Sequence, residues 1–439
     1  MRHYTIRIMT AVKQPCFLFT FIFGLIYQLS LGAELSDTLR INGKNAEEIF
    51  LKKNLTLLAE RLNINQAEAM ILQAKVWPNP NLSIDEINFN RNETSEKIPP
   101  LIGDFGRNQQ FTLQLEQLIL TAKKRKKNIR LETTNKILAE NSFMDILLAL
   151  KAEFRSELAE LIYQQRLKDD LSLQNNIIVK LLDAQSAQFK LGNISRADFL
   201  RIKALHISVN SELNKINAQI TEKQTKLKTW MAISPSTHIV ILDAPDNVEI
   251  ERLQSLSVQK LLEDADRNNT QIKLANNSKD ISVDKLAIEQ AKKTPDITLN
   301  LSYDRNGSTM FNFFGAGIAM DIPLFDRNKG NIKHAVLEVQ KDELKLREKK
   351  LAINNQIVEH FQNLKQAIHL YNQIDKDYLS ELKHVQAAVA DNFIKKNLSL
   401  LAFLDLFNSF KESKQLYYQS LKDIKMKENE LSYLAGMEL

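Results

Sequence analysis

Two long stretches of the chain contain neither glycine nor proline, and their apolar residues recur at steps of three and four positions. Such spacing places the apolar side chains along one stripe of a helix and is typical of a coiled-coil seam. The first stretch, about residues 125–190, predicts a helix roughly 100 Å long at about 1.5 Å per residue. The seam positions are Phe143, Leu147, Leu150, Phe154, Leu158 and Leu161, and then Ile357, Phe361, Leu364, Ile368 and Tyr371.

Four short segments instead alternate apolar and polar side chains at every second position, which predicts strands. The alternation is clearest at residues 297–303 and 111–116, and weaker at 81–89 and 311–322. Polar links rich in turn residues separate the members of each pair. The pattern therefore predicts two β-hairpins, within residues 81–120 and 296–324.

The order of helix, hairpin, long helix, tip and helix occurs twice, which indicates an internal duplication. FKLGNISRADFL (189–200) and FIKKNLSLLAFL (393–404) share five of twelve positions, and AKVWPNPNLSI (74–84) matches AKKTPDITLNL (291–301). We expect tips near residues 189–198 and 393–402. The predicted units are a signal segment at 1–33, a first repeat at 34–232, a linker at 233–254 and a second repeat at 255–439.

The N-terminus has the pattern of a secretory signal peptide, with three basic residues before the apolar run 17–31. A signal anchor is the alternative, although the run is short for a membrane span. Without residues 1–33 the chain keeps 56 basic and 53 acidic side chains, which argues against a general nucleic-acid binder. Cys16, the sole cysteine, would leave with the signal, so no disulfide is expected.

Four strands are too few to close a membrane barrel within one chain, because bacterial barrels need about eight or more. An open sheet in lipid would leave its edge hydrogen-bonding groups unpaired. The strands must therefore lie in a soluble domain or share a barrel with other copies of the chain. Their alternation suits a wall with lipid outside and water inside.

Several segments resemble the outer-membrane factors of tripartite efflux systems, the TolC-like proteins. The matching stretches lie in family order at residues 55–84, 189–200, 319–335 and 397–410. IPLFDRNKGNI (322–332) most resembles the heavy-metal branch of cobalt–zinc–cadmium exporters. The corresponding place in the first half, LILTAKKRKKN, lacks the glycines usual in the family, so that half fits less well.

The resemblance implies a mainly α fold with a β-barrel part, built as a homotrimer in the bacterial outer membrane. Each protomer would give four strands to a shared twelve-stranded transmembrane β-barrel, and long coiled-coil helices to a periplasmic α-barrel. It also implies a periplasmic adaptor protein and an inner-membrane RND pump as partners, and contact with outer-membrane lipid.

The tips carry residues suited to a tight turn between helices. Gly192 can adopt the left-handed conformation that often ends a helix. Ser195 can cap the next helix, with Asp198 three residues on as in a capping box. In the second tip Lys396 stands where Gly192 does, so we expect Asn397 to supply the left-handed residue. The resemblance implies adaptor contact by Gly192, Asn193, Ser195, Lys396, Asn397 and Ser399.

The resemblance also implies that acidic residues just after the tips narrow the pore and attract cations. Asp198 fits this role in the first half, with helix capping as the alternative. In the second half Ala402 occupies the matching place, and Asp405 lies one turn further on. Asp405 has no capping reason to be acidic. Asp198 and Asp405 are therefore the pore candidates.

A basic run directly follows the second predicted strand of each half. Its side chains could anchor the protein at the inner headgroup layer by snorkelling. A solvated start to a helix is the alternative. The membrane-interface candidates are Lys123, Lys124, Arg125, Arg327 and Lys329.

No catalytic constellation, phosphate loop or metal-ligand spacing is recognisable, and no cofactor is expected. We expect a passive outer-membrane channel of an RND-type efflux system that conducts heavy-metal cations, and not an enzyme. A channel for drugs or for type I protein secretion is one alternative. A structural periplasmic coiled-coil protein, with its strands in a soluble domain, is the alternative from another class.

Overall fold

The computed structural model describes most of the chain. The expected signal segment, residues 1–33, lies outside the described residues, as does Lys396. The described residues are 38–87, 102, 110–243, 249–306, 311–374, 381, 385, 388–389, 391–395 and 397–439.

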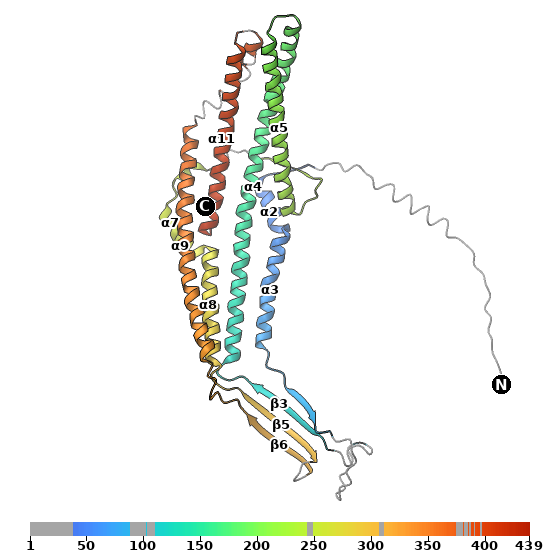
Figure 1. Cartoon of the computed structure of the whole chain (residues 1–439), viewed down its shortest axis with the longest axis vertical. Coiled ribbons are helices and arrows are strands. Elements are labelled where there is room, and N and C mark those ends of the chain that lie inside the picture. The colour runs from blue at the N-terminus through green and yellow to red at the C-terminus, as the bar shows by residue number, and fades with distance from the viewer. Residues whose placement is uncertain are drawn as a thin grey trace, which may run out of the picture.

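Four long helices dominate the molecule: α4 (Lys124–Lys190), α5 (Arg196–Met231), α9 (Lys329–Gln373) and α11 (Leu400–Ala435). The longest, α4, has 67 residues and runs nearly the whole length of the helical part (Figure 1). Its length agrees with the absence of helix breakers in its sequence. α9 ends earlier than its breaker-free sequence suggests, because Ile374 leaves the helical conformation with ψ near 112°.

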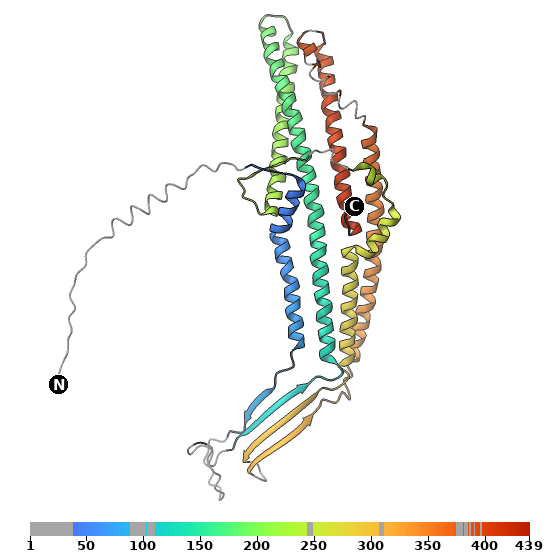
Figure 2. The ribbon, with the colours of Figure 1, turned by 180° about the vertical axis from the view of Figure 1, so that it is seen from behind.

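The shorter helices α3 (Leu55–Lys75) and α8 (Thr270–Ala291) continue the layer toward the sheet. The long helices and these two shorter ones lie side by side in one layer. Near the sheet their order across the layer is α3, α4, α8 and α9, and toward the tips it is α5, α4, α11 and α9. Figures 1 and 2 show this elongated layer from its two sides. α3 and α9 therefore form its two lateral edges near the sheet.

The buried side chains form two cores, and each runs mainly along the helices of one repeat. In the first, Phe154, Leu158 and Leu161 of the predicted α4 seam are buried against α5. In the second, Ile357 and Leu364 of α9 are buried with residues of α11. The apolar seams read from the sequence thus mark the faces on which these helices pack.

One four-stranded sheet lies at the end of the helical layer. Its strands are β2 (Asn81–Asp85), β3 (Thr112–Ile119), β5 (Ile297–Asn306) and β6 (Phe311–Ala319), in the order β2-β3-β5-β6. All neighbouring pairs are antiparallel. The β3–β5 pairing joins the two halves of the chain, a link that the sequence pattern did not predict. β6 ends at Ala319, three residues before the end of the predicted strand.

One face of this sheet is mainly apolar, and the other is mainly polar or small, with Leu118 and Phe313 among its apolar exceptions. Cross-strand partners continue the alternation from strand to strand, as in the row Leu82, Leu115, Leu301 and Ala316. The neighbouring row on the opposite face, which contains Ser83, is polar or small throughout. Apolar side chains are exposed on all four strands, including Leu82, Ile84, Leu115, Leu299, Leu301, Phe314 and Ile318.

A second, small sheet was not predicted from the sequence. β1 (Thr38–Ile41) pairs in parallel with β4 (His238–Ile241). The side chains of Gln165 and Gln224 donate hydrogen bonds to the carbonyl oxygen of Ile239 at 3.0 and 2.8 Å. These bonds fix the small sheet to the middle of α4 and to the C-terminal part of α5 (Figure 1).

Matching helix caps occur at corresponding places in the two predicted repeats. Asn54 lies between α2 (Gly43–Lys53) and α3, and Asn269 lies between α7 (Val258–Asn268) and α8. Each side-chain oxygen accepts from the backbone N–H three residues on, at 2.9 and 3.0 Å. Each side-chain amide donates to a carbonyl near the end of a long helix, that of Trp230 or of Leu434.

Candidate functional site

The turn between α4 and α5 forms the first tip. Gly192 has φ +75°, as predicted for the residue after a helix end. The backbone N–H of Gly192 donates to the carbonyl of Phe189, and that of Asn193 donates to the carbonyl of Gln188, both at 3.0 Å. Ser195 caps α5 by accepting from the N–H of Asp198 at 3.0 Å. The first tip is therefore a closed turn with its backbone groups paired.

The second tip repeats these contacts at positions 204 residues later. The N–H of Asn397 donates to the carbonyl of Asn392 at 2.9 Å, and Ser399 caps α11 by accepting from the N–H of Ala402 at 3.2 Å. The expectation that Asn397 takes the left-handed conformation is wrong, because its φ is not positive. Asn397 corresponds to Asn193, which follows the left-handed residue in the first tip.

A pair of stacked phenylalanines supports each tip. The rings of Phe189 and Phe199 lie 5.1 Å apart, and those of Phe393 and Phe403 lie 4.9 Å apart. These phenylalanines occupy two of the five positions that the two tip sequences share. The shared residues thus close the turn from both sides and account for much of the similarity.

The two acidic pore candidates differ in their surroundings. The carboxylate of Asp198 accepts a hydrogen bond from the Ser195 hydroxyl at 2.7 Å and lies 3.5 Å from Arg201. Asp405 is exposed on α11, and no ion pair or hydrogen bond to its side chain occurs within the described residues. Asp198 therefore has a structural role in the cap, whereas Asp405 has none. The pore role of both residues stays a prediction.

The beginning of α4 is fixed to both repeats, at what we call the first junction. The ammonium of Lys124 lies 2.8 Å from Asp296 and donates to the carbonyl of Thr294 at 2.7 Å. The backbone N–H of Thr121 donates to Asp296 at 2.8 Å, and its hydroxyl donates to the carbonyl of Pro295 at 2.5 Å. Burial acts to raise the pKa of Asp296, but the bonds from Lys124 and Thr121 outweigh it and hold that pKa below its ordinary value.

Arg125 makes the matching contact to the first repeat. Its Nε donates to the carbonyl of Lys75 at 3.0 Å, and its guanidinium lies 4.7 Å from the Trp77 ring centroid. Both Lys124 and Arg125 are therefore held by neighbouring chain segments. Lys123 is exposed and begins α4 with φ 58°. The headgroup role of these three residues stays a prediction.

At the beginning of α9, which we call the second junction, the basic side chains have fewer neighbours. Arg327 and Lys329 are exposed, and neither has an ion pair among the described residues. Between them Asn328 begins α9 with φ 56°, and its amide donates to the carbonyl and carboxylate of Glu289 at 2.8 and 2.7 Å. The apolar side chains of Ile322, Leu324 and Phe325 just before it are exposed.

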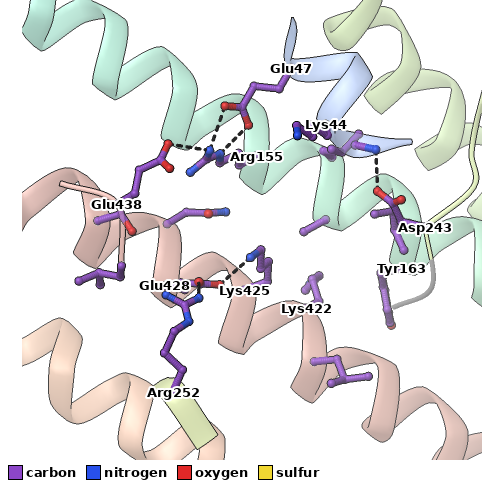
Figure 3. Close-up of a pocket in the computed structure, with 18 of the residues that line it drawn as sticks. Lys44, Glu47, Arg155, Tyr163, Asp243, Arg252, Lys422, Lys425, Glu428 and Glu438 are labelled. Atoms are coloured by element: carbon purple, nitrogen blue, oxygen red, sulfur yellow. Dashed lines mark hydrogen bonds and ion pairs between the residues drawn. The ribbon is translucent and has the colours of Figure 1, made fainter. Parts of the chain in front are cut away.

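A crevice of about 590 Å³ opens where the middle of α4 meets α2 and α11. Figure 3 shows that its charged side chains face one another. Arg155 binds Glu47 at 2.6 Å and Glu438 at 3.1 Å, and Arg252 binds Glu428 at 2.7 Å. Of these pairs, Arg155–Glu438 connects the first half of the chain with the second, so the crevice lies where the two halves meet.

In the part of the chain that the structure describes, no helix is long and apolar enough to cross a membrane. Within those residues, no group of three or more His, Cys, Asp or Glu side chains could hold a metal ion.

No protein-family model matches the chain. It is 24% identical over 291 residues to the cobalt-zinc-cadmium resistance protein CzcC of Cupriavidus metallidurans. The match covers 66% of this chain and 64% of CzcC, so it spans just under two thirds of that relative.

Solved structures of outer-membrane channels share the fold over 90% of this chain. CusC superimposes with a TM-score of 0.68 at 17% identity, over 90% of this chain and 92% of CusC. The outer-membrane protein VceC of Vibrio cholerae gives a TM-score of 0.67 at 16% identity, over 90% and 96% of the two chains. The chain therefore has the fold of the TolC-like outer-membrane channels, which confirms the resemblance seen in its sequence.

Proposed function

We propose that the protein is the outer-membrane channel of a tripartite, RND-type efflux system, and that it conducts heavy-metal cations passively. It acts as a conduit and not as an enzyme. A periplasmic adaptor protein binds its tips, and an inner-membrane pump supplies the energy.

The observation that carries this proposal is the exposed apolar face of the four-stranded sheet. Leucines, isoleucines and Phe314 lie exposed on that face, while the other face is mainly polar or small, with Leu118 and Phe313 among its apolar exceptions. A soluble domain would bury such a face, because exposing a large apolar patch to water is unfavourable. A membrane wall with lipid on the apolar face and water on the polar face satisfies both surfaces.

The sheet also supports a homotrimer. β2 and β6 each have one open edge, and unpaired edge groups are not tolerated in lipid. Three copies that pair β6 with β2 of the next copy would form a closed twelve-stranded barrel. A closed barrel leaves no edge, which is why we prefer it to the soluble-domain alternative.

The helical layer supports the same assembly. On α9 the exposed residues Leu337, Leu344, Leu351 and Val358 recur every seven positions. On α3, at the other edge of the layer, Leu55, Leu58, Leu62 and Leu72 are exposed at heptad spacing. Such stripes are typical of helices that pack against a partner. In a head-to-tail ring, α9 of each copy would cover α3 of the next.

The metal substrate rests on the similarity to CzcC, whose name assigns it to cobalt, zinc and cadmium resistance. The described residues offer no ligand cluster, so the ions would cross in water and not bind on the way. Exposed acids such as Asp405 would raise the local concentration of cations at the pore.

Deletion of the gene, followed by growth on a panel of cations and drugs, tests the substrate. We expect lower tolerance to divalent heavy-metal cations, restored by the wild-type gene. Loss of drug tolerance with unchanged metal tolerance would reject the metal assignment and favour the drug-channel alternative.

A further inference from the structure

We propose that the second junction is completed by a second copy of the chain, in which the turn Trp77–Asn79 binds Asp326 and Lys329. This inference rests on the homotrimer proposed above and names the residues through which the copies meet at the boundary between sheet and helices.

The starting point is the equivalence of the two junctions. Lys123 and Asn328, which precede α4 and α9, have nearly the same backbone conformation, with φ/ψ of 58°/26° and 56°/24°. Aligning the helices on these residues places Asp326 at the position of Thr121, and Lys329 at the position of Lys124.

The turns that precede the strands are equivalent as well. AKVWPNPNLSI and AKKTPDITLNL align without a gap, so Trp77, Pro78 and Asn79 correspond to Thr294, Pro295 and Asp296. In the first junction, the turn Thr294–Asp296 of the second repeat binds the start of α4 in the first repeat. The equivalent contact for α9 therefore needs the turn Trp77–Asn79 of a first repeat.

That turn must come from another copy. β2 follows Trp77–Asn79 and β6 precedes Asp326, and these strands lie at opposite edges of the sheet. β3 and β5 separate them within one copy. If β6 pairs with β2 of the next copy, that copy's turn Trp77–Asn79 arrives beside Lys329, as Thr294–Asp296 lies beside Lys124.

The side chains at the two junctions are complementary in the same way. The first junction holds one acid and one base, Asp296 and Lys124, together with the neutral Thr121. In the first junction the acid, Asp296, lies in the turn before a strand. In the second junction that position holds Asn79, and the acid is Asp326, at the position of Thr121 before the helix. The side-chain amide of Asn79 can accept a hydrogen bond from Lys329 and donate one to Asp326. Each junction then contains one positive charge, from Lys124 or Lys329, and one negative charge, from Asp296 or Asp326.

Most side chains of the second junction and of the turn Trp77–Asn79 are exposed in the single chain, as expected for a surface that a second copy covers. Lys329 and Asn79 are exposed, whereas the side chain of Lys124 is only 12% exposed. Phe325, next to Asp326, is fully exposed, and Val76 and Trp77 are exposed on the other side. Docking would bury these apolar groups beside the polar contact, which favours association.

Cysteine crosslinking tests the contact directly. We expect the double variant Asn79→Cys/Asp326→Cys, oxidised in the isolated outer-membrane fraction, to give covalent dimers and trimers on a non-reducing denaturing gel. The matched control Thr121→Cys/Asp296→Cys should form its disulfide within one copy and stay at monomer size. Each single variant should give no covalent trimer.

Charge exchange provides a second test that does not depend on oxidation. Asn79→Asp alone places two carboxylates beside Lys329 and should lower the temperature at which the trimer dissociates. Asn79→Asp/Asp326→Thr recreates the residues of the first junction and should restore that temperature. If Asn79 and Asp326 acted only within their own copy and did not meet, Asp326→Thr would not restore the dissociation temperature lowered by Asn79→Asp.

The outcomes separate this inference from the proposed function. A heat-sensitive trimer whose Asn79→Cys/Asp326→Cys variant gives no interchain bond, while the Thr121→Cys/Asp296→Cys control reacts, overturns the inference and leaves the channel proposal standing. Absence of any trimer in the wild-type protein contradicts the homotrimer itself.

Discussion

Asn54 and Asn269 show how one residue type can stabilise equivalent places in two repeats. Both are almost fully buried, and both use the amide nitrogen and the carbonyl oxygen of the side chain in hydrogen bonds. Truncation leaves buried backbone groups without partners, which costs about 1–3 kcal/mol.

We therefore expect Asn54→Ala and Asn269→Ala each to lower the free energy of unfolding by about 1–3 kcal/mol. Asn63→Ala is the matched control, because Asn63 is an exposed residue within α3 and its only described side-chain bond is to Glu60. Thermal unfolding of the detergent-solubilised protein measures the effect. Equal unfolding temperatures for Asn54→Ala and Asn63→Ala would show that the cap contributes nothing.

Glu157 gives a prediction about pH. Burial acts to raise its pKa, but the ammonium groups of Lys226 and Lys223, at 2.8 and 3.1 Å, outweigh burial and lower it below the ordinary value. A lowered carboxyl pKa stabilises the fold above the ordinary pKa, and this contribution is lost as the pH falls through the folded-state value. Glu157→Gln should thus be less stable than wild type at pH 7. The difference should shrink toward about pH 3.

At the tips, Asp405 tests the pore hypothesis most cleanly, because no cap contact of its own would be lost. We expect Asp405→Asn to lower the cation preference of single channels in planar bilayers without changing thermal stability. Asp198→Asn should affect stability as well, since Asp198 contacts Ser195 and Arg201. Unchanged ion selectivity in both variants would remove these acids from the pore.

At the scale of elements, the exposed stripe on α9 should hold neighbouring copies together. Leu344 and Leu351 are exposed in the protomer, so replacing them should not unfold it. We expect Leu344→Asp/Leu351→Asp to abolish the trimer while the helical circular dichroism stays unchanged. Ala352→Asp, exposed on α9 but beside the stripe, should leave the trimer intact. A stable trimer in the double leucine variant would contradict the proposed packing of α9.

Much of the element order could be predicted, because long helices and alternating strands repeat a simple pattern. The end of α9 at Gln373 could not, since no glycine or proline marks it. β1 and β4 were missed because each has only four residues, and their pairing brings together positions about 200 residues apart. The prediction for Asn397 is wrong because Asn397 aligns with Asn193, whose place in the turn is one residue after the left-handed Gly192.

At the scale of the whole molecule, the family resemblance correctly predicted a mainly helical chain with a few strands and the fold of TolC-like channels, while the homotrimer and the shared twelve-stranded barrel stay predictions. The contacts at the first junction could not be predicted, because they depend on the β3–β5 pairing that joins the repeats. The basic run from Lys123 to Arg125 suggested a lipid surface, yet two of its side chains bind the protein itself. The positive charge of these side chains alone could not show whether they bind lipid headgroups or groups of the protein.

Fractionation of the wild-type protein tests the central claim most directly, since an outer-membrane channel of this fold must assemble in the membrane. We expect the protein in the outer-membrane fraction, where unheated samples run on a denaturing gel as a trimer that heating converts to the monomer. A soluble monomer in the periplasmic fraction would contradict the account and favour a structural coiled-coil protein.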